Sequence, residues 1–121
     1  MYLIGCDIGT QGTKSVLVNE RGEVLVEAQR EYDVIKPGSN WAEQWPDVWA
    51  KAAFNTIREV AEKAEVTKKE IAGLAISGLY GGSGVPVDRE MKPLHPCLIW
   101  MDRRATAQTS WVKENIPKEK I

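Results

Sequence analysis

A short glycine-rich segment near the N-terminus holds the residues best suited to chemistry, and it reads Asp7-Ile8-Gly9-Thr10-Gln11-Gly12-Thr13-Lys14. Glycines let a backbone turn approach a ligand closely, and the N–H groups of such a turn can point together at an anion. Threonine hydroxyls can donate to phosphate oxygens, and a lysine adds positive charge. The segment therefore predicts a phosphate site made by Gly9, Thr10, Gly12, Thr13 and Lys14.

Asp7 lies directly before this turn, at the end of an apolar run. A carboxylate in that place can hold Mg²⁺, usually through water, because Mg²⁺ gives up its water reluctantly. The chain contains neither GxxxxGK[ST] nor GxGxxG, so a bound nucleotide would need a different geometry from those two loops. The alternative is a plain β-hairpin with a glycine-rich turn and no ligand, and the segment alone leaves both interpretations open.

The residues on either side of the turn indicate strands. Two apolar runs, Tyr2–Asp7 and Thr13–Val18, predict the two arms of a hairpin. After a turn signal at Asn19–Gly22, apolar and polar residues alternate from Val26 to Val34. We therefore expect three successive antiparallel strands that hold the glycine-rich turn at one end.

A helix and a buried strand follow. Pro46 suits the first position of a helix, and apolar residues at three- and four-residue spacing continue the pattern to Ala64. Ile71–Ser77 is a compact apolar run, which predicts a buried strand parallel to the first one. This order predicts an α/β domain of the ribonuclease-H-like or actin-like type, with a mixed sheet and helices.

The last third of the chain has weaker signals. Val85–Asp88 resembles a short edge strand, and Cys97–Met101 is a last short apolar run. Asp102 is expected to cap a final helix that contains Ala105, Ala107, Trp111 and Val112. Pro117 would open another helix that the chain does not finish, so we expect a truncated end and an incomplete first lobe.

Composition excludes several classes of protein. The 121 residues carry 16 basic and 17 acidic side chains, so charge gives no reason to expect nucleic acid as partner. No apolar run is long enough to span a membrane, and the N-terminus lacks the basic region of a signal peptide. Cys6 and Cys97 form neither a disulfide framework nor a zinc pattern, and are expected to be buried. We expect a reduced, cytoplasmic protein, and a homodimer stays open.

Four segments, taken in order, match the motifs of one family. Asp7–Thr10 resembles the Asp-x-Gly-Thr hairpin of actin-like sugar kinases, and Asn40–Gln44 resembles the Gly-Trp-x-Glu-Gln segment of the FGGY carbohydrate kinases. Ile76–Gly78, with the glycine-rich turn after it, resembles their sugar-contacting segment. Pro93–Ala105 resembles their Pro-x-I-x-W-x-D-x-R-A segment. Residues 1–121 are therefore identified as the N-terminal part of the first lobe of an FGGY kinase.

The resemblance implies a role for each matching position. Such a kinase transfers the γ-phosphate of ATP to a sugar hydroxyl with Mg²⁺, and Asp7 would lie near the metal and the transferring phosphate. Thr10, Gly12, Thr13 and Lys14 would line the phosphate side. Tyr80 and Gly81 would contact the sugar. Trp100 would present its apolar face to the sugar carbons, and Asp102 or Arg103 would form hydrogen bonds with the sugar hydroxyls.

One segment departs from the patterns of two branches of the family. Leu79-Tyr80-Gly81 stands where xylulose kinases commonly have Gln-Met-His and glycerol kinases have Gln-Arg-Glu. Met101-Asp102 beside Trp100 favours a ketose such as xylulose over glycerol, gluconate or ribulose.

The resemblance also implies that this stretch lacks part of the machinery. The family's catalytic base is an Asp in a later Gly-Asp segment, and no Gly-Asp pair occurs here. The missing partner would be the C-terminal lobe of the same polypeptide, and we expect the 121 residues alone to be inactive. A non-catalytic actin-like nucleotide-binding module is the alternative, although it would have no need of the Trp100–Arg104 segment.

Overall fold

The structure is a computed structural model that describes residues 1–78 and 82–120. In chain order its elements are the strands β1 (Tyr2–Ile8), β2 (Gly12–Asn19), β3 (Val24–Glu31) and β4 (Glu43–Gln44), the helix α1 (Pro46–Lys63), the strands β5 (Ile71–Ser77) and β6 (Cys97–Leu98), the helix α2 (Thr106–Asn115) and the 3₁₀ turn η1 (Lys118–Lys120). Neither helix in these ranges is long and apolar enough to cross a membrane.

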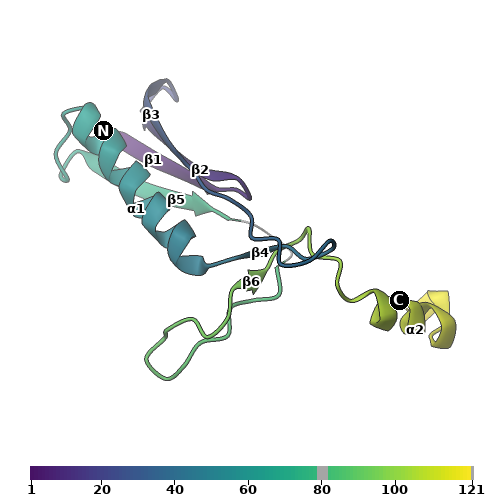
Figure 1. Cartoon of the computed structure of the whole chain (residues 1–121). Helices are drawn as coiled ribbons and strands as arrows, with labels where there is room; N and C mark the ends of the chain where they lie inside the picture. Colours follow the sequence, from purple (N-terminus) through teal and green to yellow (C-terminus); the bar gives the residue numbers. More distant parts are fainter. Residues whose placement is uncertain (79–81, 121) are drawn as a thin grey trace.

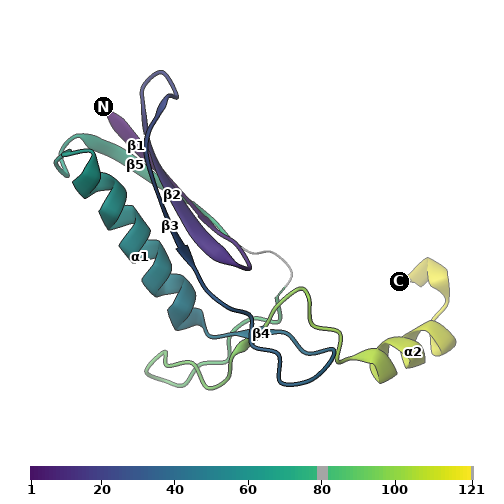
Figure 2. The ribbon, with the colours of Figure 1, turned by 45° about the horizontal axis from the view of Figure 1, so that its top comes forward.

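The main sheet has four strands in the order β3-β2-β1-β5. β1, β2 and β3 pair antiparallel, whereas β5 returns through α1 to pair parallel with β1. The predicted neighbourhood of Tyr2–Asp7 and Ile71–Ser77 is thus confirmed. Figures 1 and 2 show α1 lying along one face of this sheet. The mixed sheet with a helix on one face has the layout expected from the sequence for an actin-like α/β domain.

One apolar layer lies between α1 and the sheet. Its centre is formed by Ile4, Leu17, Ala28 and Val60, which the alternation of the strands and the helical spacing place on facing surfaces. A buried pair of hydroxyls joins the two elements, because Ser15 Oγ lies 2.7 Å from Thr56 Oγ1. Thr56 donates its own proton to backbone carbonyls of α1, so Ser15 is the donor in this pair.

The prediction that β5 is a buried strand was wrong for the described part of the chain. Leu74 and Ile76 face the same side as Ile4 and Cys6, yet they are 52% and 55% exposed. The reason is the placement of α1, which packs on β1, β2 and β3 and leaves this end of the sheet bare. Cys6 and Cys97 are both buried, as expected.

Three predictions for the irregular segments also need correction. β3 ends at Glu31 and does not reach Val34. Val85–Asp88 is not a strand, since only Val87 makes an isolated bridge, and Pro86 has no N–H for a ladder. The N-cap of α2 is Ala105 and not Asp102, whose carboxylate is engaged elsewhere.

A second, smaller sheet combines a segment before α1 with a segment after β5. β4 and β6 pair antiparallel as a two-stranded ribbon, with Glu43 opposite Leu98 and Gln44 opposite Cys97. Both views show α2 standing away from the sheet (Figures 1 and 2), and no residue of α2 is buried. This ribbon lies near the glycine-rich turn and brings distant parts of the sequence to it.

Candidate functional site

The glycine-rich turn between β1 and β2 is tightly closed. The Gly9 N–H donates to the Gly12 carbonyl at 2.9 Å. A Cβ atom at Gly12 would lie 2.8 Å from the Arg30 carbonyl oxygen, so a larger residue would push β3 away. The glycine at position 12 is therefore required by packing against β3, a reason that the sequence did not reveal.

Tyr32 supports this turn from β3's side. Its hydroxyl donates to the Gly9 carbonyl at 2.7 Å and lies 3.0 Å from Thr13 Oγ1. Because the phenol has one proton, Thr13 is the donor in the second bond. Burial raises the pKa of Tyr32 above its ordinary value, so the phenol, which is already protonated at neutral pH, stays a hydrogen-bond donor in alkaline solution as well. Thr13 is completely buried, so it shapes the turn from beneath and does not present its hydroxyl to solvent.

Gln44 holds the same turn from the ribbon. Its Nε2 donates to the Thr10 carbonyl at 2.7 Å and to the Asp33 carbonyl at 3.2 Å. Its Oε1 accepts from the Trp49 indole N–H at 3.1 Å. Gln44 is almost completely buried, so every polar atom of its amide has a protein partner and the amide orientation is fixed.

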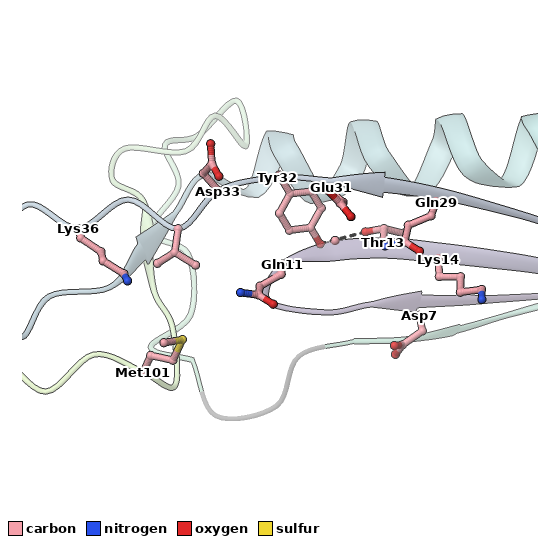
Figure 3. A pocket seen from close by; sticks show the side chains of 12 residues that line it. Asp7, Gln11, Thr13, Lys14, Gln29, Glu31, Tyr32, Asp33, Lys36 and Met101 are labelled. Carbon is pink, nitrogen blue, oxygen red and sulfur yellow. Dashed lines mark hydrogen bonds between the residues drawn. The ribbon is translucent and has the colours of Figure 1, made fainter.

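A groove of about 860 Å³ runs beside the turn (Figure 3). Its charged lining residues are the acids Asp7, Glu31 and Asp33 and the bases Lys14 and Lys36. The lining therefore has three carboxylates and two ammonium groups, and Lys14 already pairs with Glu27 at 2.7 Å. Such a groove would not hold a polyphosphate by itself, because the anion would meet excess negative charge.

Asp7 is the carboxylate best placed to hold a metal cation, which would offset the excess negative charge of the groove. It is exposed at the end of β1, opposite Lys14 in the β1–β2 register. Residues 1–78 and 82–120 contain no cluster of three side chains able to cage a metal ion. A single exposed carboxylate suits Mg²⁺, which keeps several waters and shares its remaining positions with phosphate oxygens. The residues present thus fit Mg²⁺ and a polyphosphate bound together better than they fit the metal ion or the polyphosphate alone.

Trp100 connects the turn to a segment 90 residues further along the chain. Its indole N–H donates to Thr10 Oγ1 at 2.9 Å, while the side chain is 49% exposed. An indole can only donate, so the Thr10 hydroxyl accepts from it and keeps its own proton free for another acceptor. The predicted phosphate residue Thr10 and the predicted sugar residue Trp100 are therefore in direct contact.

Arg104 is the centre of a charged cluster behind Trp100. Its guanidinium contacts both oxygens of Asp102, donates to Glu43 Oε1 at 2.6 Å and lies 3.8 Å from the centre of the Trp41 ring. Asp102 Oδ2 also accepts the Ala42 N–H at 2.8 Å. The Arg104 guanidinium holds the pKa of the Asp102 carboxyl well below its usual range. Both oxygens of Asp102 are engaged, so a sugar hydroxyl would have to displace one of these bonds.

Arg103 is more open than its neighbour. Its Nη1 donates to the carbonyls of Trp100 and Asp102 at 2.7 and 3.1 Å, and the residue is exposed. It is therefore free to meet a ligand beside Trp100. The other two predicted sugar residues, Tyr80 and Gly81, lie outside the described residues.

The sequence interpretation assigned no role to Tyr32, Glu43, Gln44 and Arg104. A signal was present for three of them, because Glu43 and Gln44 belong to the Asn40–Gln44 motif and Arg104 to the Pro93–Ala105 motif. Their contacts depend on partners distant in the sequence.

Comparisons with known proteins identify the family. A model of the N-terminal domain of the FGGY family of carbohydrate kinases matches residues 2–121. The xylulose kinase of Bacillus subtilis (strain 168) is 33% identical over 107 residues, which cover 88% of this chain and 21% of that protein. The glycerol kinase of Albidiferax ferrireducens (strain ATCC BAA-621 / DSM 15236 / T118) is also 33% identical, over 105 residues, covering 86% and 21%.

A solved structure agrees with both sequence comparisons. The crystal structure of a xyloylose kinase from Brucella ovis superposes with a TM-score of 0.82 at 29% identity and covers 95% of this chain and 24% of that one. The chain belongs to the FGGY family of carbohydrate kinases. It spans less than a quarter of the length of these relatives.

Proposed function

We propose that this chain is the N-terminal part of the first lobe of an ATP-dependent kinase that phosphorylates a sugar hydroxyl, with a ketose such as xylulose as acceptor. The observation that supports this best is the hydrogen bond between Trp100 and Thr10. It brings the half-exposed aromatic face against the glycine-rich turn. A sugar on Trp100 would thus lie next to a phosphate at the turn, as phosphoryl transfer requires.

The residues of the turn would share the work on the nucleotide side. Gly9, Gly12 and Lys14 would surround the phosphates of ATP, and the free proton of the Thr10 hydroxyl would point to one of their oxygens. Asp7 would hold Mg²⁺ through water. The bound metal would neutralise phosphate charge, and Thr13 would act indirectly by keeping the turn in shape through Tyr32.

On the acceptor side, Trp100 would cover the C–H face of the sugar and Arg103 would bond its hydroxyls. Asp102 would contribute only by giving up bonds to Arg104 or Ala42. Tyr80 and Gly81 complete the proposed wall. Xylulose is preferred because of Met101-Asp102 beside Trp100; glycerol, gluconate and ribulose are the alternatives, since relatives of equal identity include both xylulose and glycerol kinases.

The 121 residues alone are proposed to be inactive. The catalytic base and most of the adenine site would come from the C-terminal lobe of a longer parent polypeptide, in keeping with the length of the relatives. A non-catalytic actin-like nucleotide-binding module remains the second candidate. The Trp100–Arg104 segment beside the turn favours the kinase, because a module that only binds nucleotide has no use for an acceptor wall.

A substrate panel tests this function. The parent polypeptide is assayed for ADP release with xylulose, ribulose, gluconate and glycerol, and kcat/KM is compared. We expect xylulose to lead, and Asp7→Ala to lower turnover by about 100-fold or more without unfolding the protein. Glycerol ahead of xylulose by more than about tenfold, or 1.4 kcal/mol, would overturn the proposed substrate. Absence of sugar-dependent ADP release would favour the non-catalytic module.

A further inference from the structure

Residues Trp41–Gln44, which we call the bridging segment, touch both halves of the candidate site. At one end Gln44 bonds the Thr10 carbonyl in the glycine-rich turn. At the other end Trp41, Ala42 and Glu43 all contact Arg104 or Asp102, which follow Trp100. Because the bridging segment is short, its ends cannot move far apart. Its position therefore determines how the glycine-rich turn lies relative to Trp100 and Arg103, which we call the sugar wall.

The contact with the turn depends on a carboxamide. The Gln44 Nε2 donates to two backbone carbonyls, Thr10 and Asp33, while Oε1 accepts from the Trp49 indole. A glutamate of the same shape would bring a negative oxygen against the two carbonyls and would have no proton to donate at neutral pH. An unpaired buried charge is costly, so the turn would move away from its position.

The contact with the wall depends on a guanidinium. Arg104 reaches Asp102 and Glu43 while its plane lies on the Trp41 ring. A planar fork can make these contacts together, whereas the point charge of a lysine cannot both bridge two carboxylates and stack in this way. The backbone adds two bonds, from Ile99 N–H to the Ala42 carbonyl and from Arg103 N–H to the Asn40 carbonyl.

We propose that Gln44 and Arg104 are positioning residues, which act through the bridging segment to hold the phosphate turn and the sugar wall at a fixed separation. The inference rests on the proposed function for its kinetic consequences. Gln44 fixes the position of the glycine-rich turn on the nucleotide side, because it bonds the Thr10 carbonyl. Arg104 fixes the position of Trp100 and Arg103 on the acceptor side, because it anchors the segment that carries them. The Thr10–Trp100 bond forms only when both are in place.

The kinetic test uses Gln44→Glu and Arg104→Lys in the parent polypeptide, with Gln108→Glu on α2 and Arg58→Lys on α1 as matched, exposed controls. Arg104→Lys is expected to raise the KM for the sugar about tenfold and to change the KM for ATP by less than about twofold. Gln44→Glu is expected to lower kcat and raise the KM for ATP, with the smaller effect on the sugar. The controls are expected to behave as the unsubstituted enzyme.

Hydrogen–deuterium exchange supplies a readout that needs no activity. Arg104→Lys is expected to increase amide exchange in peptides covering residues 97–104, and Gln44→Glu in peptides covering 8–14, while β2 and β3 beyond the turn keep their protection. If Arg104→Lys does not fold, Glu43→Gln replaces it, because it removes the ion pair between Arg104 and the bridging segment and keeps the side-chain shape.

The outcomes separate this inference from the proposed function. Parent protein without sugar-dependent activity would contradict the function, and the exchange pattern alone would then decide the positioning role. The positioning role is supported if each variant changes mainly the KM of its own substrate, sugar for Arg104→Lys and ATP for Gln44→Glu, and if the increased exchange stays within residues 97–104 or 8–14, respectively. Equal changes in both KM values, a lowered melting temperature with unchanged kcat and KM, or increased exchange over the whole sheet would overturn it.

Discussion

Two regions of this chain are stabilised in different ways. The unit of β1, β2, β3 and α1 has a shared apolar layer, with Leu17 and Val60 completely buried. Among the described residues 82–120, the buried residues are Cys97 and Ile99, and α2 has none. That second region is fixed to residues 40–43, which connect β3 to α1, by backbone bonds and the charged cluster around Arg104.

The difference explains where the candidate site is and why it is built from polar bonds. The phosphate turn extends from the packed unit, whereas Trp100 belongs to the weakly packed region, and the two meet through one side-chain hydrogen bond. Apolar packing is non-directional, but hydrogen bonds and a planar guanidinium fix orientation. Geometry at the site therefore depends on charges and hydrogen bonds, while stability depends on the apolar layer.

The largest expected effect on stability comes from the packed unit. Leu17→Ala should lower the free energy of unfolding by about 3 kcal/mol, because it removes a completely buried side chain and leaves a cavity beneath α1. Urea denaturation followed by circular dichroism measures this. Leu94→Ala, in an exposed loop, is the control. Equal effects of the two substitutions would mean that the apolar layer does not dominate.

An intermediate effect is expected from acid pH on the charged cluster. Arg104 lowers the pKa of Asp102 in the folded state, so this carboxylate contributes stability above its ordinary pKa of about 3.9 and loses it as pH falls further, through the lowered value. The near-ultraviolet signal of the tryptophans, to which Trp41 and Trp100 contribute, should thus stay constant between about pH 6 and 8 and change only well below about pH 4. Asp102→Asn should remove much of that acid transition. A transition centred near neutrality would contradict this assignment.

The smallest effect is expected in α2. Trp111 is 59% exposed, so Trp111→Ser should change the free energy of unfolding by less than about 0.5 kcal/mol in the 121-residue chain. The same denaturation experiment measures it. A loss of more than about 1 kcal/mol would show that α2 packs against the sheet, and that the two regions are less different than described.

Local patterns were enough to predict much of this protein. The strands on both sides of Gly9–Gly12 and the helix from Pro46 follow from apolar periodicity and turn residues, signals that act over a few positions. The parallel pairing of β5 with β1 follows from the crossover connection that the helix makes between the two ends of the sheet. The family motifs correctly indicated the FGGY family.

What the sequence by itself determined is the order of the main-sheet strands and the two helices, the family and the residue types at the turn. Only the tertiary structure decided which polar groups meet: Tyr32 beneath Gly9, Gln44 on the Thr10 carbonyl, and Arg104 on Asp102 and Glu43. It also decided that α1 leaves β5 uncovered. The physical reason is the distance along the chain over which each interaction acts. Periodicity and capping depend on neighbours along the chain, whereas a hydrogen bond between residues 10 and 100 exists only after several elements have packed and set its length and angle.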